Sequence, residues 1–388
     1  MTEAVIVDAV RTPGGKRNGN LKDWHAAALA AHVLRAIEER NDLDPSMVDD
    51  VVMGCVMQVG EQSLNIGRNA VLAAGWPESV PATTIDRQCG SSQQAMHFGA
   101  QGVMAGAYDI VVAAGVEVMT RTPMGASIVQ GMGFPFPQDQ IDRYADTGLP
   151  PQGIGAEMIA DEYGFSRTDL DGLGAESQQR AAVARDEGRF ENEIIPVPIE
   201  LDGEAKIIVA DEGIREGTTV ETLAKLKPAF KEDGVVTAAN SSQISDGASA
   251  VLIMSREKAD ELGLKPRARF HSFAIAGADP VTMLKGPIPV TEKILEKSGL
   301  SIDDIDLFEV NEAFASVVLA WQKETGADMT KVNVNGGAIA LGHPLGSSGT
   351  KLMATLLNEL ERTGGRYGMQ VMCEGGGMAN ATIIERLD

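Results

Sequence analysis

The chain has 388 residues, 44% of them hydrophobic and 23% charged, which is typical of a globular protein with one large or two medium domains. Its 55 acidic and 33 basic residues give a net charge of −22, which argues against nucleic acid or an anionic membrane as a partner. The three cysteines, Cys55, Cys89 and Cys373, do not form a disulfide framework, and none has zinc-ligand spacing.

The first third of the chain alternates strand and helix signals. Residues 1–17 predict a first strand and a turn rather than a signal peptide, and no apolar run approaches membrane-spanning length. We therefore expect a cytoplasmic protein. Apolar runs predict buried strands, and apolar residues at helical spacing predict helices. The expected strands are 4–7, 51–56 and 110–115, and the expected helices are 26–39 and 91–105.

The regular pattern breaks down at 120–151, a stretch rich in proline and glycine that predicts a long insertion. Helical signals return at 155–163 and 168–185, and an α/β pattern restarts at 267. The two α/β parts resemble each other. Gly-Ser-Ser at 90–92 and at 346–348 each opens a helix that leads to an apolar strand, so we expect an internal duplication.

Cys89 is a candidate nucleophile because it lies where a loop enters a helix. The helix dipole and the nearby Arg87 would favour its thiolate. From this segment alone, a buried cysteine that packs as a small hydrophobe is the commoner interpretation. Cys55, in a strand-like apolar run, fits that interpretation better than Cys89 does.

His343 is a candidate general base, because Gly342 and Pro344 on either side would fix its backbone and leave its ring free. The alternative is a loop histidine without a role. That alternative applies more readily to the other four histidines, which are His25, His32, His97 and His271.

Two further segments follow predicted strands. Cys373 is followed by Glu374 and three glycines, including Gly375, whose backbone N–H groups could bind an oxyanion. Asn311 follows a strand expected at 305–308 and could position water or a carbonyl, although helix capping is the commoner role. In α/β folds, active sites lie at such strand ends.

In these motifs the chain resembles the thiolases, from Glu3 to the last strand. The segments 311–314 (NEAF), 335–344 (NGGAIALGHP) and 373–377 (CEGGG) match the family pattern, and 11–13 and 242–248 agree with it. The segments at 62–63 and 241–247 are more similar to degradative thiolases of the fatty-acid and steroid side-chain type.

The resemblance implies a thiolase fold, with two duplicated α/β domains in a five-layer αβαβα arrangement and an inserted loop domain. The first part of the N-terminal domain would be 1–119, followed by a CoA-binding insertion with return to that domain at 120–247. The end of the N-terminal domain and a linker would be 248–266, and the C-terminal domain 267–388.

The resemblance also implies an acyltransferase that cleaves 3-ketoacyl-CoA to acetyl-CoA and a shortened acyl-CoA, or runs the reverse condensation. Cys89 would carry the acyl group, His343 would take the thiol proton, and Cys373 would move the α-proton. Asn311 with His343 would hold the water of one oxyanion hole, and the N–H groups of Cys89 and Gly375 would form the other.

Coenzyme A and acyl-CoA would be substrates, with no permanently bound cofactor or metal. Arg215 matches an arginine that packs against adenine, and Ser242 a serine that contacts the pantetheine arm. A homotetramer or dimer that acts in fatty-acid β-oxidation is the expected context.

Departures from the family pattern are Asp86, Ser92 and Glu374. A carboxylate at 374 would raise the pKa of Cys373 if it pointed into the site. Pro151 and Gln152 replace a bulky His-Met pair beside Gly153 and Gly155, so we expect a wider acyl channel, although Met283 retains part of the short-chain wall.

Three alternatives remain at this point. One is a short-chain acetyl-CoA acetyltransferase, and another is a thiolase-like binding or scaffold protein without activity. The third is a decarboxylating ketoacyl synthase, which would carry histidine or asparagine in place of Cys373.

Overall fold

The computed structural model describes residues 2–201 and 203–388, whose main feature is a ten-stranded mixed sheet. The strands run in the order β10-β11-β12-β9-β1-β8-β5-β3-β4, and β2 pairs with β8. The strands of the first half are β1 (Ala4–Arg11), β2 (Gly15–Lys16), β3 (Asp50–Gly54), β4 (Ala82–Ile85), β5 (Ile110–Val118) and β8 (Ser245–Ser255). Those of the second half are β9 (Ala268–Gly277), β10 (Leu307–Val310), β11 (Tyr367–Glu374) and β12 (Met378–Arg386).

The strand order confirms the duplication. The first half contains β3-β5-β8-β1 and the second β10-β11-β12-β9, and in each the first pair is parallel and the next two are antiparallel. The halves join edge to edge where Val5 of β1 pairs with Arg269 of β9 and Ile6 with Ala268. The two sheets are therefore continuous at this edge.

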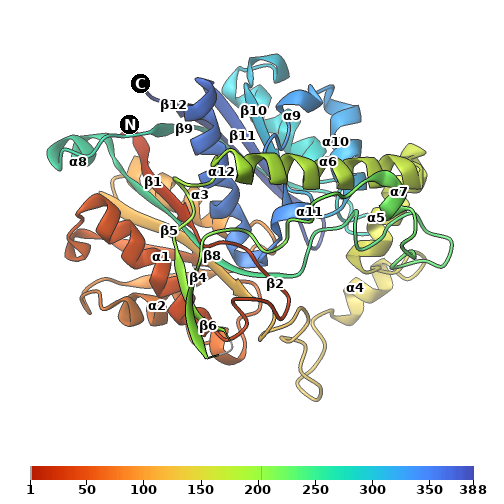
Figure 1. Ribbon diagram of the computed structural model, residues 1–388, viewed down its shortest axis with the longest axis horizontal. Helices are drawn as coiled ribbons and strands as arrows, with labels where there is room; N and C mark the ends of the chain where they lie inside the picture. The colour runs from red at the N-terminus through yellow and green to blue at the C-terminus, as the bar shows by residue number, and fades with distance from the viewer. Residues whose placement is uncertain (1, 202) are drawn as a thin grey trace.

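Helices complete the five layers (Figure 1). Helices α1 (Ala26–Asn41) and α2 (Ile66–Ala74) pack on the first half of the sheet, and α9 (Pro287–Ser298) packs on the second half beside α10 (Ala315–Thr325). Between the halves, α3 (Ser91–Met104) and α12 (Ser348–Thr363) pack against each other. Because α12 contacts strands of both halves, the middle layer is shared.

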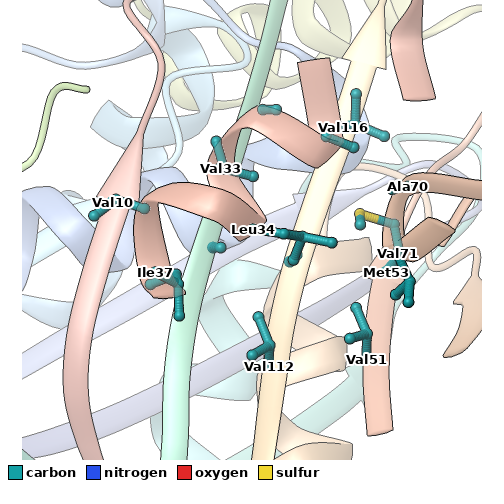
Figure 2. Packing of buried hydrophobic residues seen from close by; sticks show 14 of the residues in the cluster. Val10, Val33, Leu34, Ile37, Val51, Met53, Ala70, Val71, Val112 and Val116 are labelled. Carbon is teal, nitrogen blue, oxygen red and sulfur yellow. The ribbon is translucent and has the colours of Figure 1, made fainter. Parts of the chain in front are cut away.

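Alternation along the strands explains this layering. Val5 and Val10 of β1 belong to the core under α1 and α2, whereas Ala4 and Ile6 belong to the core around α3 and α12. Figure 2 shows the first of these cores, where residues of α1 face those of the strands. These residues include Val33, Leu34 and Ile37 of α1 and Val10, Val112 and Val116 of the strands. Each such side chain, once buried, contributes roughly 1.5–3 kcal/mol.

The segment between β5 and β8 contains the expected insertion. It holds α4 (Gln138–Arg143), α5 (Gln152–Tyr163), α6 (Arg167–Asp186), β6 (Val197–Leu201), β7 (Glu204–Ile208) and α7 (Val220–Leu223). Helix α5 begins earlier than predicted, after Pro151, and α6 begins at a capping box formed by Ser166 and Asp169. None of the helices in the described part of the chain has the length and apolar character to span a bilayer.

The remaining helices are α8 (Arg256–Glu261) and α11 (Ala338–Leu341). One strand differs from its prediction, because β10 begins at Leu307 rather than at Ile305. Residues 302–304 form a 3₁₀ turn, and Ile305 is the C-cap residue of this turn rather than the first residue of the strand. The later end of β10 places Asn311 directly after the strand.

Candidate active site

Cys89 lies in a tight turn before α3. Gln88 has a φ of 48°, and the carboxylate of Asp86 accepts a hydrogen bond of 2.6 Å from the Gln88 N–H. The Asp86 side chain therefore stabilises the turn, which places Cys89 just before the N-cap residue of the helix. The thiol is 4% exposed and packs in an apolar cluster. The buried members of this cluster are Val56, Cys89, Met119, Leu345, Leu352 and Met372.

The expectation that the helix start lowers the pKa of Cys89 is wrong. Burial raises the pKa of this thiol, and charges on Cys373 and Glu374 raise it further. Hydrogen bonds from the backbone N–H groups of Cys89 and Gly375 act in the opposite direction but do not outweigh burial. The thiol is therefore protonated at neutral pH and needs a base, and two N–H donors point at its sulfur.

His343 lies in the loop between α11 and α12, and its hydrogen bonds define its tautomer. Nδ1 bonds to the hydroxyl of Ser348, and that hydroxyl donates its only hydrogen to the Pro344 carbonyl at 2.8 Å. Ser348 must therefore accept from Nδ1–H, which leaves Nε2 with a free lone pair. Burial lowers the pKa of His343 to about 3, and the positive charge of Lys351 lowers it further, so the ring is neutral.

Asn311 joins the histidine to the second thiol. Its Nδ2 lies 3.5 Å from Nε2 of His343 and 3.9 Å from Sγ of Cys373. Burial raises the pKa of Cys373 to about 12, although the hydrogen bond from Asn311 lowers it. The helix-cap alternative for Asn311 is wrong, because α10 has Phe314 at its N-cap position. Two protonated thiols, a neutral imidazole and an amide thus share one buried site.

Family models match almost the whole chain. The thiolase N-terminal domain matches residues 4–257, and the thiolase C-terminal domain matches residues 264–386. The chain belongs to the thiolase family.

Curated relatives and a solved structure cover this thiolase over its full length. It is 52% identical to the steroid 3-ketoacyl-CoA thiolase FadA6 of Mycobacterium tuberculosis, covering 100% of this chain and 95% of that protein. It is 45% identical to a 3-ketoacyl-CoA thiolase of Aliivibrio fischeri, covering 100% of both. The crystal structure of the Bacillus anthracis acetyl-CoA acetyltransferase matches with a TM-score of 0.91 at 38% identity, covering 100% of this chain and 99% of that one.

The two residues predicted to contact CoA lie in different surroundings. The backbone N–H of Ser242 donates to the carbonyl of Ala313 at 2.9 Å, and Ala313 stands two residues after Asn311 in the chain. Arg215 is exposed in the insertion, and its backbone N–H donates to Gln178 Oε1 at 2.7 Å. Its guanidinium is therefore accessible at the surface of the thiolase.

Other parts of the chain fill the space beside the two glycines at 153 and 155. The ring of Phe230 occupies the space where a Gly153 side chain would lie, and backbone atoms of Thr282 occupy the space beside Gly155. Phe230 also packs against Phe314 with ring centroids 5.9 Å apart. In the sequence, Phe230 stands out as an aromatic residue within a polar run, but this pattern does not show that it packs against Gly153.

Glu374 lies against the Cys89 turn. Its side chain occupies the space beside Gly90, and its Oε2 is 4.0 Å from Nη1 of Arg87. The residue is fully buried, and its carboxylate oxygens have no hydrogen-bond partner among the residues that the structure describes. When it is ionised, the Glu374 carboxylate raises the pKa of both Cys89 and Cys373 through its charge.

Proposed function

We propose that the chain is a 3-ketoacyl-CoA thiolase, an acyltransferase that uses Cys89 as its nucleophile. The observation that carries the proposal is that a buried, protonated Cys89 thiol lies near Cys373, which Asn311 joins to an imidazole whose Nε2 carries a lone pair. The second thiol, that of Cys373, contacts the side-chain amide of Asn311 and supports the proposal, because carbon–carbon cleavage needs an acid in addition to the nucleophile.

In the cleavage direction, His343 Nε2 takes the proton of Cys89 as sulfur attacks the 3-keto carbon. The N–H groups of Cys89 and Gly375 stabilise the resulting oxyanion. The bond between C2 and C3 then breaks, and its electron pair forms the enolate of acetyl-CoA. Asn311 and His343 stabilise that enolate through a water, and Cys373 protonates C2. The thiol of free CoA finally attacks the acyl carbon on Cys89 and gives its proton to the Cys373 thiolate, while the Cys89 thiolate leaves and takes back the proton held by His343, which releases a shortened acyl-CoA.

The participants follow from this chemistry. Each step is a nucleophilic attack or a proton transfer, so coenzyme A and acyl-CoA are substrates and the enzyme needs no resident metal or redox cofactor. Because the chain carries a net charge of −22, polyanionic CoA requires local positive charge, which the exposed Arg215 supplies, and Ser242 contacts the pantetheine arm. We place the enzyme in fatty-acid β-oxidation as a cytoplasmic homo-oligomer.

The acyl chain is proposed to be longer than acetoacetyl. The relative at 52% identity is named a steroid 3-ketoacyl-CoA thiolase, which favours bulky 3-ketoacyl groups. The second candidate is a short-chain acetyl-CoA acetyltransferase, which is the name of a relative at 45% identity from Syntrophomonas wolfei. The packing of the Phe230 ring against Gly153 favours this second candidate, because the ring fills space that we expected to be part of a wide acyl channel.

Mass spectrometry of the protein after incubation with acyl-CoA tests the nucleophile. The acyl group should appear on the peptide containing Cys89 in wild type, and Cys89→Ala should abolish it. A label on Cys55 or Cys373, or no label, would contradict the assignment. Thiolysis of a 3-ketoacyl-CoA series tests the substrate, and activity confined to acetoacetyl-CoA would favour the second candidate.

A further inference from the structure

Lys351 is a buried cation next to the proposed base that the mechanism above does not use. It lies on α12, is 4% exposed, and donates hydrogen bonds to the carbonyls of Leu341 and Gly342, the latter at 3.0 Å. These carbonyls are at the end of the short helix α11, where intrahelical donors are lacking, and they immediately precede His343. The ammonium thus fixes the backbone on which the base is carried.

Lys351 also lines a small cavity together with Asn311, Ser348 and Glu309. The cavity has a volume of about 10 Å³, which is room for one water molecule. Oδ1 of Asn311 and Oε2 of Glu309 are buried and have no hydrogen-bond partner among the described residues. Such buried acceptors are costly unless a donor satisfies them.

Counting hydrogen atoms connects these observations. An ammonium has three N–H donors, and the two carbonyls use two of them. A water that accepts the third can donate its own two hydrogens to Asn311 Oδ1 and Glu309 Oε2. It would then have three protein partners, which is usual for a buried water. Held at Oδ1, the Asn311 amide keeps Nδ2 directed at His343 and Cys373.

We propose that Lys351 and one water in this cavity form a shared anchor that positions both His343 and Asn311 for catalysis. The proposal rests on the thiolase function given above. A neutral amine has only two N–H donors, so deprotonation leaves either a carbonyl or the water without a donor. Catalysis should therefore require the protonated form of Lys351.

The charges around Lys351 place this protonation within an accessible pH range. Burial lowers the pKa of Lys351 to about 8. Asp211, Glu193 and Glu309 raise this pKa through their negative charges, and Arg11 lowers it through its positive charge. Arg11 pairs with Asp211 at 2.7 Å and with Glu193 at 2.5 Å, so these two carboxylates are already engaged. The remaining neighbour, Glu309, has a pKa raised well above its usual range by burial.

The test measures the rate of acyl transfer to Cys89 as a function of pH in wild type, Lys351→Arg and Lys351→Met. Wild type should lose rate as pH rises through about 8, whereas Lys351→Arg, which keeps its charge and has five donors, should not. Lys351→Met should be slower by about 10- to 100-fold at all pH values, since a displaced base and amide lose alignment. Lys331→Met is the matched control, because Lys331 donates to the Ile305 carbonyl at 2.9 Å, away from His343, and it should keep the wild-type pH profile.

Identical pH profiles of wild type and Lys351→Arg would overturn the proposal, even if Lys351→Met fails to fold. A crystal structure should place a water within hydrogen-bond distance of Lys351 Nζ and Asn311 Oδ1, and an empty cavity would also overturn it. If wild-type protein is acylated on Cys89 but the variants are unchanged, only the role of Lys351 is wrong. If wild type is never acylated on Cys89, the proposed function is wrong, and the role of Lys351 with it.

Discussion

Replacing Glu374 with glutamine should stabilise the protein at alkaline pH. The carboxyl group is fully buried, and burial raises its pKa from 4.5 to about 8, although Arg87 lowers it and Asp86 raises it. Because the pKa is higher in the folded protein than in the unfolded chain, the folded state holds the extra proton. Stability is therefore fully retained below pH 4.5 and falls as pH rises to about 8.

The magnitude follows from the shift. Each pKa unit corresponds to about 1.4 kcal/mol, so the ionised carboxylate costs up to about 5 kcal/mol of unfolding free energy above pH 8. Between about pH 6 and pH 9 the change is about 3 kcal/mol. Glu374→Gln keeps the shape of the protonated side chain and cannot ionise, so it should lack this part of the pH dependence.

Urea unfolding of wild type and Glu374→Gln at about pH 6 and about pH 9 measures the difference directly. The advantage of the variant over wild type should grow by about 3 kcal/mol between the two pH values. Glu78→Gln, at an exposed position, is the control and should show no such growth. Equal pH dependence in wild type and Glu374→Gln would refute the view that this carboxyl is buried without compensation.

The remaining predictions concern the reaction. Cys373→Ala should keep acyl transfer from acyl-CoA to Cys89 but lose 3-ketoacyl-CoA thiolysis, because only carbon–carbon cleavage needs the α-proton moved, and near-normal thiolysis would contradict this. Ser348→Ala removes the acceptor of His343 Nδ1–H, so the acylation rate should fall about tenfold or more, with Ser348→Thr as the conservative control. Glu374→Ala should move the pH–rate profile to lower pH, since the carboxylate raises the pKa of both thiols, and an unchanged profile would show that its charge does not reach them. Phe230→Ala should raise kcat/KM for long 3-ketoacyl-CoAs relative to acetoacetyl-CoA, and a chain-length series with an unchanged ratio would remove Phe230 from the acyl wall.

The fold was predictable because its elements have local signals. The apolar run at 110–115 is strand β5, and the helix expected at 91–105 is α3. The repeated Gly-Ser-Ser at 90–92 and 346–348 indicated the duplication, since each copy stands before the same kind of helix and strand. The predicted start of β10 at Ile305 was wrong because an apolar residue can either follow a turn or begin a strand, and the local sequence pattern does not distinguish the two.

The sequence singled out residues that the structure brings together, but it did not show the electrostatics of their surroundings. Cys89 and His343 stood out because each has a glycine next to it in a predicted loop, and Cys373 stood out because it ends a predicted strand just before Glu374 and three glycines. The raised pKa of Cys89 depends on burial by residues that are distant in sequence, such as Leu345 and Met372, and no local pattern shows that burial. Long-range contacts of this kind also hid the packing of Phe230 against Gly153 and the hydrogen bonds from Lys351 to the carbonyls of Leu341 and Gly342.

The two halves can form one site only if they are held in fixed register, and buried polar contacts in the middle layer provide this. The Thr350 N–H of α12 donates to Ser92 Oγ of α3 at 3.0 Å, which gives Ser92 a structural role. Gln370 of β11 donates to Gln93 Oε1 of α3 at 3.0 Å and to the Gly349 carbonyl at 2.8 Å. A slide between α3 and α12 would leave these buried groups without partners, at a cost of roughly 1–3 kcal/mol each. The first half supplies Cys89 and the second half supplies the histidine, the amide and the second thiol, so neither half carries a complete set. The polar middle layer therefore does more than stabilise the fold, because it fixes the position of the proposed nucleophile relative to the proposed base.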